Sequence, residues 1–138
     1  MDVRCAEFAS LHRLLPIFPI SCNSSSSGPG PGGETPVYHI GDTGLAGGII
    51  FYDQGAVING WRYLEAAPYD QNTGMQWGTQ SINTGATGTA IGTGKSNTAA
   101  IVAALGTGYS YPALLCKNFS LNGYSDWFLP STDELGEI

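Results

Sequence analysis

Basic side chains are scarce in this chain. Its 138 residues include 5 Lys and Arg against 11 Asp and Glu, and the only lysines are Lys95 and Lys117. Binding a polyanion requires clustered Lys and Arg that replace its counterions. The composition therefore excludes nucleic acid as a partner. The formal charge of -6 also argues against a basic helix on a membrane surface.

Cysteine and histidine are scarce as well, with 3 Cys and 2 His. No spacing among them matches a zinc site, and no Ser-His-Asp set can be identified. Cys116 lies in the apolar stretch PALLCKNF with no His nearby, which predicts a lone buried thiol. The stretch that begins at Asp70 starts like a calcium loop but has Met75 and Ser81 where glycine and glutamate belong. We predict a protein that is not an enzyme and uses neither a metal nor a cofactor.

A long hydrophobic run is missing too. The apolar run near the N-terminus, Leu14 to Ile20, is too short to span a bilayer. With Arg4 and Arg13 before it and Cys22 after it, the stretch resembles the export signal of a bacterial lipoprotein. In that interpretation residues 1–22 are the signal, the lipid is attached to Cys22, and Cys5 is removed with the leader. The alternative is that residues 1–36 form a disordered tail.

The next segment, residues 23–36, reads NSSSSGPGPGGETP. Such a Ser, Gly and Pro sequence does not bury a core and predicts a flexible tether. A tether fits a domain that is exported to the cell envelope or surface, either secreted or held at the membrane only through its lipid. The domain itself is predicted over residues 37–138.

Strand signals come early in this domain. Beta-branched and aromatic residues predict three strands, at 36–40, 47–53 and 60–68, with the first two paired. The 20 glycines predict many turns and short elements rather than a helical bundle. A long irregular run, residues 69–95, follows the third strand.

Helix signals dominate the second half of the domain. Ser96 or Asn97 is expected to cap a helix that stops at Gly106. A short helix is predicted over 111–118, and Ser131 with Glu134 forms a capping box for a third. The fold class is therefore α+β: a small mixed or antiparallel sheet with two or three short helices and long Gly, Thr and Asn-rich loops.

The stretch IGTGKSNTAA, residues 91–100, looks like a nucleotide-binding loop. Such a loop needs a glycine five residues before its Gly-Lys-Ser, and Thr89 occupies that position. The sequence that leads into it, INTGATGTA, is polar and does not predict a buried strand. We therefore interpret the stretch as a glycine-rich loop that opens a helix.

Aromatic residues accompany many amide and hydroxyl side chains, a mixture that suits sugars, because rings cover apolar sugar faces and amides hold hydroxyl groups. The structural alternative is that most of these rings are core. The long polar run and the stretch GYSDW are expected to meet at one surface. The candidate ligand-binding residues are Asn72, Gln76, Trp77, Gln80, Tyr124, Asp126 and Trp127.

Four ordered motifs carry a family resemblance: IGDTGLAGGIIFYD, YLEAAP, IGTGKSNTAAIVAA and NGYSDWFLPSTDEL. Together they resemble the C-terminal domain family of the Legionella collagen-like protein, over about Tyr38 to Leu135. The resemblance implies a bacterial surface or lipoprotein module of adhesin type; the namesake is a trimeric protein that binds sulfated host polysaccharides. The segment Trp127 to Pro130 is also similar to part of the C-type-lectin-like fold, which would make this an incomplete domain of that kind.

Two departures from the family shape the functional prediction. Family members continue past LPSTDEL with further strands, so the chain looks like a member truncated at its C-terminus. Few basic residues remain after the leader, which favours neutral over sulfated glycans. We predict a non-catalytic module that binds an extracellular glycan or a host surface ligand. The alternative is a structural or oligomerising module, for example a homo-oligomer assembled through strand edges.

Overall fold

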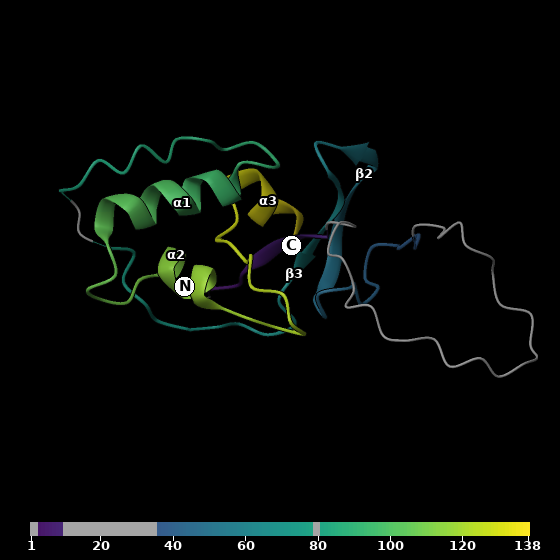
Figure 1. The fold of residues 1–138 in the computed structure, drawn as a ribbon, viewed down its shortest axis with the longest axis horizontal. Helices are drawn as coiled ribbons and strands as arrows, with labels where there is room; N and C mark the ends of the chain where they lie inside the picture. Colours follow the sequence, from purple (N-terminus) through teal and green to yellow (C-terminus); the bar gives the residue numbers. More distant parts are fainter. Residues whose placement is uncertain (1–2, 10–35, 79–80) are drawn as a thin grey trace, which may run out of the picture.

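The computed structural model describes residues 3–9, 36–78 and 81–138. Within them, a three-stranded antiparallel sheet has the order β1-β3-β2, and three helices gather on one side of it (Figure 1). The strands are β1 (Ala6–Ala9), β2 (Ile49–Ile58) and β3 (Trp61–Ala66). The helices are α1 (Gly94–Leu105), α2 (Pro112–Asn118) and α3 (Thr132–Glu137). The predicted α+β class with a small antiparallel sheet is confirmed.

Strands β2 and β3 form a hairpin around Asn59 and Gly60. Both turn residues have positive φ, 54° and 87°, as a two-residue Asn-Gly turn requires. The strand predicted over 36–40 does not form, so its pairing with 47–53 was wrong. Tyr38 instead packs edge-on against Tyr63, with ring centroids 5.4 Å apart. The two-residue turn at Asn59 and Gly60 places β3 directly beside β2, so β2 pairs with the strand that follows it in the sequence.

The N-terminal residues occupy the other edge of β3. In the pairing of β1 with β3, Phe8 lies opposite Leu64. In addition, Ala6 of β1 exchanges two backbone hydrogen bonds with Phe128, at 2.8 and 2.7 Å. Val3, Cys5, Ala6, Glu7 and Ala9 are all buried. Residues 3–9, assigned by sequence to a leader, are therefore part of the core in this structure. Cys22 lies outside the described residues, as do the rest of the predicted signal and all but the last residue of the tether.

A disulfide joins Cys5 to Cys116, with 5.2 Å between the two Cα atoms. The prediction of a lone thiol at Cys116 was wrong. The bond links the residue before β1 to α2 across a sequence separation of 111 residues. The local sequence around either cysteine does not predict this disulfide. The two cysteines come together only once β1 is paired with β3.

The helices follow their sequence signals with one correction. Helix α1 begins at Gly94 after Thr93, earlier than the expected Ser96 or Asn97, and no side chain caps it. Its predicted stop at Gly106 is confirmed, with φ of 71°. Helix α2 and the capping box of α3 also form as predicted. No helix in the described part of the chain is both long and apolar enough to cross a bilayer.

Candidate functional site

The glycine-rich loop before α1 already holds an anion, and that anion belongs to the chain itself. The Glu134 carboxylate accepts hydrogen bonds from the backbone N–H groups of Gly92 (2.8 Å), Gly94 (3.4 Å) and Ser131 (2.6 Å). The Glu134 side chain is fully buried. A Cβ on Gly94 would lie 2.2 Å from this carboxylate, so only glycine fits there. The amides that a phosphate would need are therefore occupied by Glu134.

A second internal contact holds the chain after Trp127 against α1. The hydroxyl of Thr98, a buried α1 residue, accepts a hydrogen bond from the N–H of Leu129 at 2.9 Å. Ser131 donates its hydroxyl to the carbonyl of Ala90 at 3.0 Å. The segment from Trp127 to Ser131 is thus fixed along the first half of α1. A hollow opens on each side of that helix, one lined by its Asn97 and Ile101 and the other by its Lys95 and Ala99.

The larger hollow, which we call the Trp77 groove, has a volume of about 460 Å³. Trp77 is 54% exposed and lines the groove. An apolar wall beneath a half-exposed ring suits a flat ligand with apolar and polar faces. The other lining residues are Ala86, Thr87, Gly88, Thr89, Asn97, Ile101, Leu129, Pro130, Ser131, Thr132 and Leu135.

The polar side chains of the Trp77 groove fall into two groups. The amide of Asn97 both donates to and accepts from the backbone of Gly88, so it holds the groove wall. By contrast, the exposed hydroxyls of Thr87, Thr89 and Thr132 make no hydrogen bond to another described residue. Each hydroxyl can both donate and accept, as sugar hydroxyls require of their partners.

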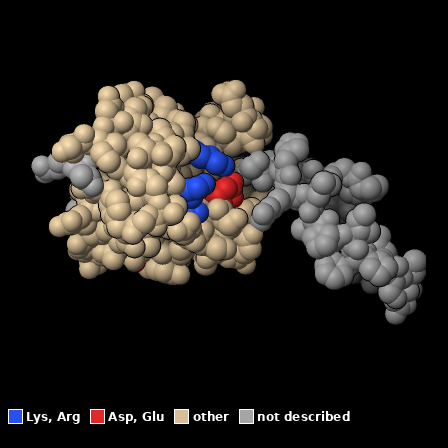
Figure 2. All heavy atoms as spheres, turned by 60° about the vertical axis from the view of Figure 1, so that its left-hand side comes forward, with Lys and Arg blue, Asp and Glu red and all other residues tan. Residues whose placement is uncertain are grey.

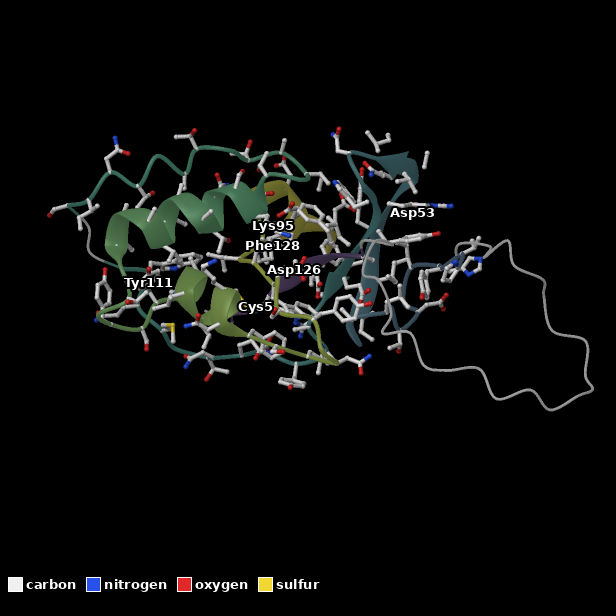
Figure 3. The ribbon with its side chains drawn as sticks, viewed as in Figure 1. Cys5, Asp53, Lys95, Tyr111, Asp126 and Phe128 are labelled. Carbon is white, nitrogen blue, oxygen red and sulfur yellow. A yellow bond between two sulfur atoms is a disulfide. The ribbon has the colours of Figure 1, made fainter. Side chains whose placement is uncertain are left out.

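The smaller hollow, which we call the Lys117 hollow, has a volume of about 200 Å³. The Lys95 ammonium forms an ion pair with the Asp126 carboxylate at 3.1 Å. Figure 3 shows these two side chains beside Phe128. Figure 2 shows basic and acidic side chains side by side in a recess of a face with almost no other charged group. The lining residues are Lys95, Thr98, Ala99, Lys117, Ser125, Asp126, Trp127 and Phe128.

Glu7 lies behind this ion pair and is 1% exposed. Burial raises its pKa to about 9, and the hydrogen bond to Asp126 and the charges of Asp126 and Glu65 act in the same direction. Protonated Glu7 therefore donates to the Asp126 carboxylate at neutral pH. Burial would raise the pKa of Asp126, but the hydrogen bonds from Glu7 and Lys95 outweigh it and lower this pKa.

Glu65 lies directly opposite Glu7 on β3, so two acidic residues face one another across the sheet. Burial raises the pKa of Glu65, although hydrogen bonds from the N–H groups of Ala46 and Gly48 oppose the shift. The distances to these donors are 3.1 and 3.0 Å. Glu65 thus ties the loop before β2 to the sheet, whereas Oε2 of Glu7 has no partner among the described residues.

The structure divides the predicted site residues. Trp77 lines the groove, while Asp126 and Trp127 line the Lys117 hollow. Asn72 accepts from the N–H of Gly74, and Gln76 is exposed. Neither lines either of these two hollows. Trp127 is 1% exposed in the core, so its ring offers no face to a sugar.

The remaining predicted residues lie elsewhere. Tyr124 is half-buried and packs against the cluster around Trp127. Gln80 lies outside the described residues. The C-terminal part of the groove lining begins at Leu129 and includes no residue of GYSDW; the hydrogen bond between Leu129 and Thr98 holds that segment against α1.

Sequence reasoning missed the hydroxyl residues of the groove and the two lysines of the hollow. Thr87 and Thr89 belong to a run that alternates Gly, Ala and Thr, which by itself resembles any loop. The local sequence around Lys95 resembles only a nucleotide-binding loop. The position of Lys95 in the first turn of α1 could have indicated its place in the hollow. Lys95 and Thr98 are three residues apart, so their side chains lie on the same face of the helix.

Comparison of the chain with family models, curated proteins and solved structures finds no match. Among the described residues, no three His, Cys, Asp or Glu side chains gather in a way that could hold a metal ion. The two hollows are therefore the features of the molecule that bear on its function.

Proposed function

We propose that this chain is a non-catalytic, exported ligand-binding module that takes a neutral glycan in the Trp77 groove. The observation that carries the proposal is the half-exposed ring of Trp77 beside three exposed threonine hydroxyls in a groove of about 460 Å³. A ring covers an apolar sugar face, and hydroxyls bond to sugar hydroxyls. The resemblance of four ordered motifs to surface modules of adhesin type supports the same function.

Export has separate support. A disulfide persists in an oxidising compartment, and Cys5–Cys116 is such a bond. The proposed lipid attachment at Cys22 is an alternative route to the surface, because cleavage ahead of Cys22 would remove both Cys5 and β1. The two arrangements leave different mature proteins, which makes them separable by experiment.

The glycan proposal is tested by isothermal titration with a neutral and a sulfated oligosaccharide at two salt concentrations. The formal charge of -6 predicts tighter binding of the neutral ligand and weak salt dependence. Preference for the sulfated ligand with steep salt dependence would contradict the charge argument.

One observation favours assembly as a second candidate function. β2 is an edge strand, and its final residues Val57 and Ile58 are 53% and 51% exposed. An open edge with apolar side chains invites pairing with another chain. Analytical ultracentrifugation of the wild type and of Val57→Lys tests this candidate, which requires a homo-oligomer that the variant dissociates. A monomer at all concentrations would eliminate it.

A further inference from the structure

The lining of the Trp77 groove contains no charged side chain among the residues that the structure describes. Ile101 and Leu129 are half-buried there, together with the exposed Trp77. A plain hexose carries hydroxyl groups around its whole ring, so some of them would lie against this aliphatic surface without a partner. A sugar that also carries an uncharged substituent with a methyl group fits the lining better. The apolar lining residues are Trp77, Ala86, Ile101, Leu129, Pro130 and Leu135.

One wall of the groove is extended backbone. Residues 86–89 line the groove and run beside α1 (Figure 1). The N–H and C=O of Gly88 both bond to the side-chain amide of Asn97, so they point to the same side, as they do in an extended chain. Successive residues of an extended chain point these groups to opposite sides. The N–H and C=O of Thr87 therefore point away from Asn97.

Thr89 indicates where this opposite side lies. Its carbonyl accepts a hydrogen bond from the N–H of Asp133 in α3, at 3.0 Å. Thr87 is two residues earlier in the extended wall, so its N–H and C=O share that direction. Thr132 and Leu135 of α3 both line the groove. The peptide groups of Thr87 therefore face the α3 side of the groove.

These peptide groups are available to a ligand. Thr87 is exposed, and neither its N–H nor its C=O bonds to another described residue. The side-chain amide of Asn97 is already used, because it pairs with Gly88. The groove thus offers a peptide N–H close to an aliphatic surface. An acetamido group has the matching chemistry, with a carbonyl that accepts a hydrogen bond and a methyl group that is apolar.

We propose that the Trp77 groove selects sugars that carry an acetamido group, which makes the ligand an N-acetylated hexosamine. This inference rests on the proposed glycan function and names its substrate class. The acetamido carbonyl accepts from the Thr87 N–H, and the methyl group lies on Ile101 and Leu129. A secondary amide is planar and trans, so its own N–H points the opposite way and donates to the hydroxyl of Thr132. The sugar ring covers Trp77.

Isothermal titration of the full chain with N,N′-diacetylchitobiose and with cellobiose tests the proposal. These neutral disaccharides share their linkage, and cellobiose has a hydroxyl group in place of each acetamido group. One added hydrogen bond and one buried methyl group should make the acetylated sugar bind about tenfold more tightly. Equal or weaker binding of the acetylated sugar would overturn this inference and leave glycan binding intact. Binding of neither sugar would contradict the proposed function as well.

Two variants at one position separate the backbone donor from the side chain. Thr87→Ala removes the hydroxyl and keeps the N–H, so the acetylated sugar should keep its advantage over cellobiose. Thr87→Pro removes the N–H as well, and the ratio of the two affinities should fall about fivefold. An unchanged ratio in folded Thr87→Pro would overturn the role given to the backbone.

Nuclear magnetic resonance on the wild type locates the acetyl group without relying on any variant. The acetyl methyl protons should show nuclear Overhauser contacts to the methyl groups of Ile101. The amide resonance of Thr87 should shift more with the acetylated sugar than with cellobiose. Saturation without a shift at Thr87, or with contacts only to residues outside the groove, would overturn the proposal.

Discussion

Cys5 and Cys116 join the residue before the first strand of the sheet to helix α2, across a sequence separation of 111 residues. In the chain that keeps residues 1–21, this bond closes nearly the whole domain into one loop. A loop of that length removes much conformational freedom from the unfolded chain, which corresponds to about 3–5 kcal/mol of stability in the chain-entropy description.

Reduction, or Cys116→Ala, should therefore lower the melting temperature sharply. Thermal unfolding with and without a thiol reductant measures the effect, and the variant should not respond to the reductant. In a Cys22→Ser background the unfolded, unreduced protein should contain no reactive thiol. Two reactive thiols would contradict the disulfide.

The raised pKa of Glu7 predicts that the stability of the fold depends on pH. Burial holds this pKa at about 9, far above its usual value, so between these two values the folded chain binds one proton more than the unfolded chain. The free energy of unfolding should then fall as pH rises, by up to about 1.4 kcal/mol per pH unit. The contribution is complete below the unfolded pKa and is lost as pH approaches 9.

Glu7→Gln keeps a neutral side chain of the same shape and should reduce this slope. Urea midpoints at pH 5, 7 and 8.5 for both proteins give the comparison. Glu65, whose pKa burial also raises, acts in the same direction and should leave a residual slope in the variant. Parallel curves for the two proteins would mean that Glu7 is not held neutral.

The Glu134 carboxylate predicts a stability effect at the start of α1. It accepts from Gly92 with one oxygen and from Ser131 with the other. Glu134→Gln replaces one acceptor with a donor, which leaves a buried N–H facing another N–H, and should cost about 1–3 kcal/mol. Glu137→Gln, an exposed change in the same helix, should stay within about 0.5 kcal/mol. Equal urea midpoints for the two variants would contradict this role of Glu134.

Lipid attachment at Cys22 predicts a different mature protein. Cells that process the leader should hold the chain in the membrane fraction, and Cys22→Ser should release it. The anchored form lacks Cys5, so its Cys116 should react once with a thiol reagent after unfolding. Intact mass gives the same distinction. Unchanged partitioning of Cys22→Ser would show that the leader was misinterpreted.

Local signals in the sequence predicted the elements that local chemistry decides. The strands at 47–53 and 60–68 were predicted from their β-branched and aromatic residues, although the Asn59-Gly60 turn that pairs them was not. The stop of α1 at Gly106 and the capping box of Ser131 with Glu134 are likewise readable within a few residues. These features need no knowledge of the remaining fold.

The features that sequence missed depend on distant contacts. β1 has no tight turn linking it to β3, so its pairing with β3, in which Phe8 lies opposite Leu64, could not be predicted from the sequence. The groove was predicted only in part, for the same reason. Trp77 was predicted because it lies among polar residues in the sequence, whereas Leu129 joins the groove lining through its long-range hydrogen bond to Thr98. Trp127, which was predicted to bind the ligand, belongs to the core instead.

Titration of a neutral oligosaccharide into the wild type, Trp77→Ala and Tyr69→Ala tests the central claim most directly. Trp77 and Tyr69 are equally exposed, 54% and 55%, but only Trp77 lines the groove. Stacking on Trp77 predicts at least about tenfold weaker binding for Trp77→Ala, because a lost aromatic contact is worth about 1.5 kcal/mol, and unchanged binding for Tyr69→Ala. Equal affinity of all three folded proteins, or no binding by the wild type, would contradict glycan binding in the groove.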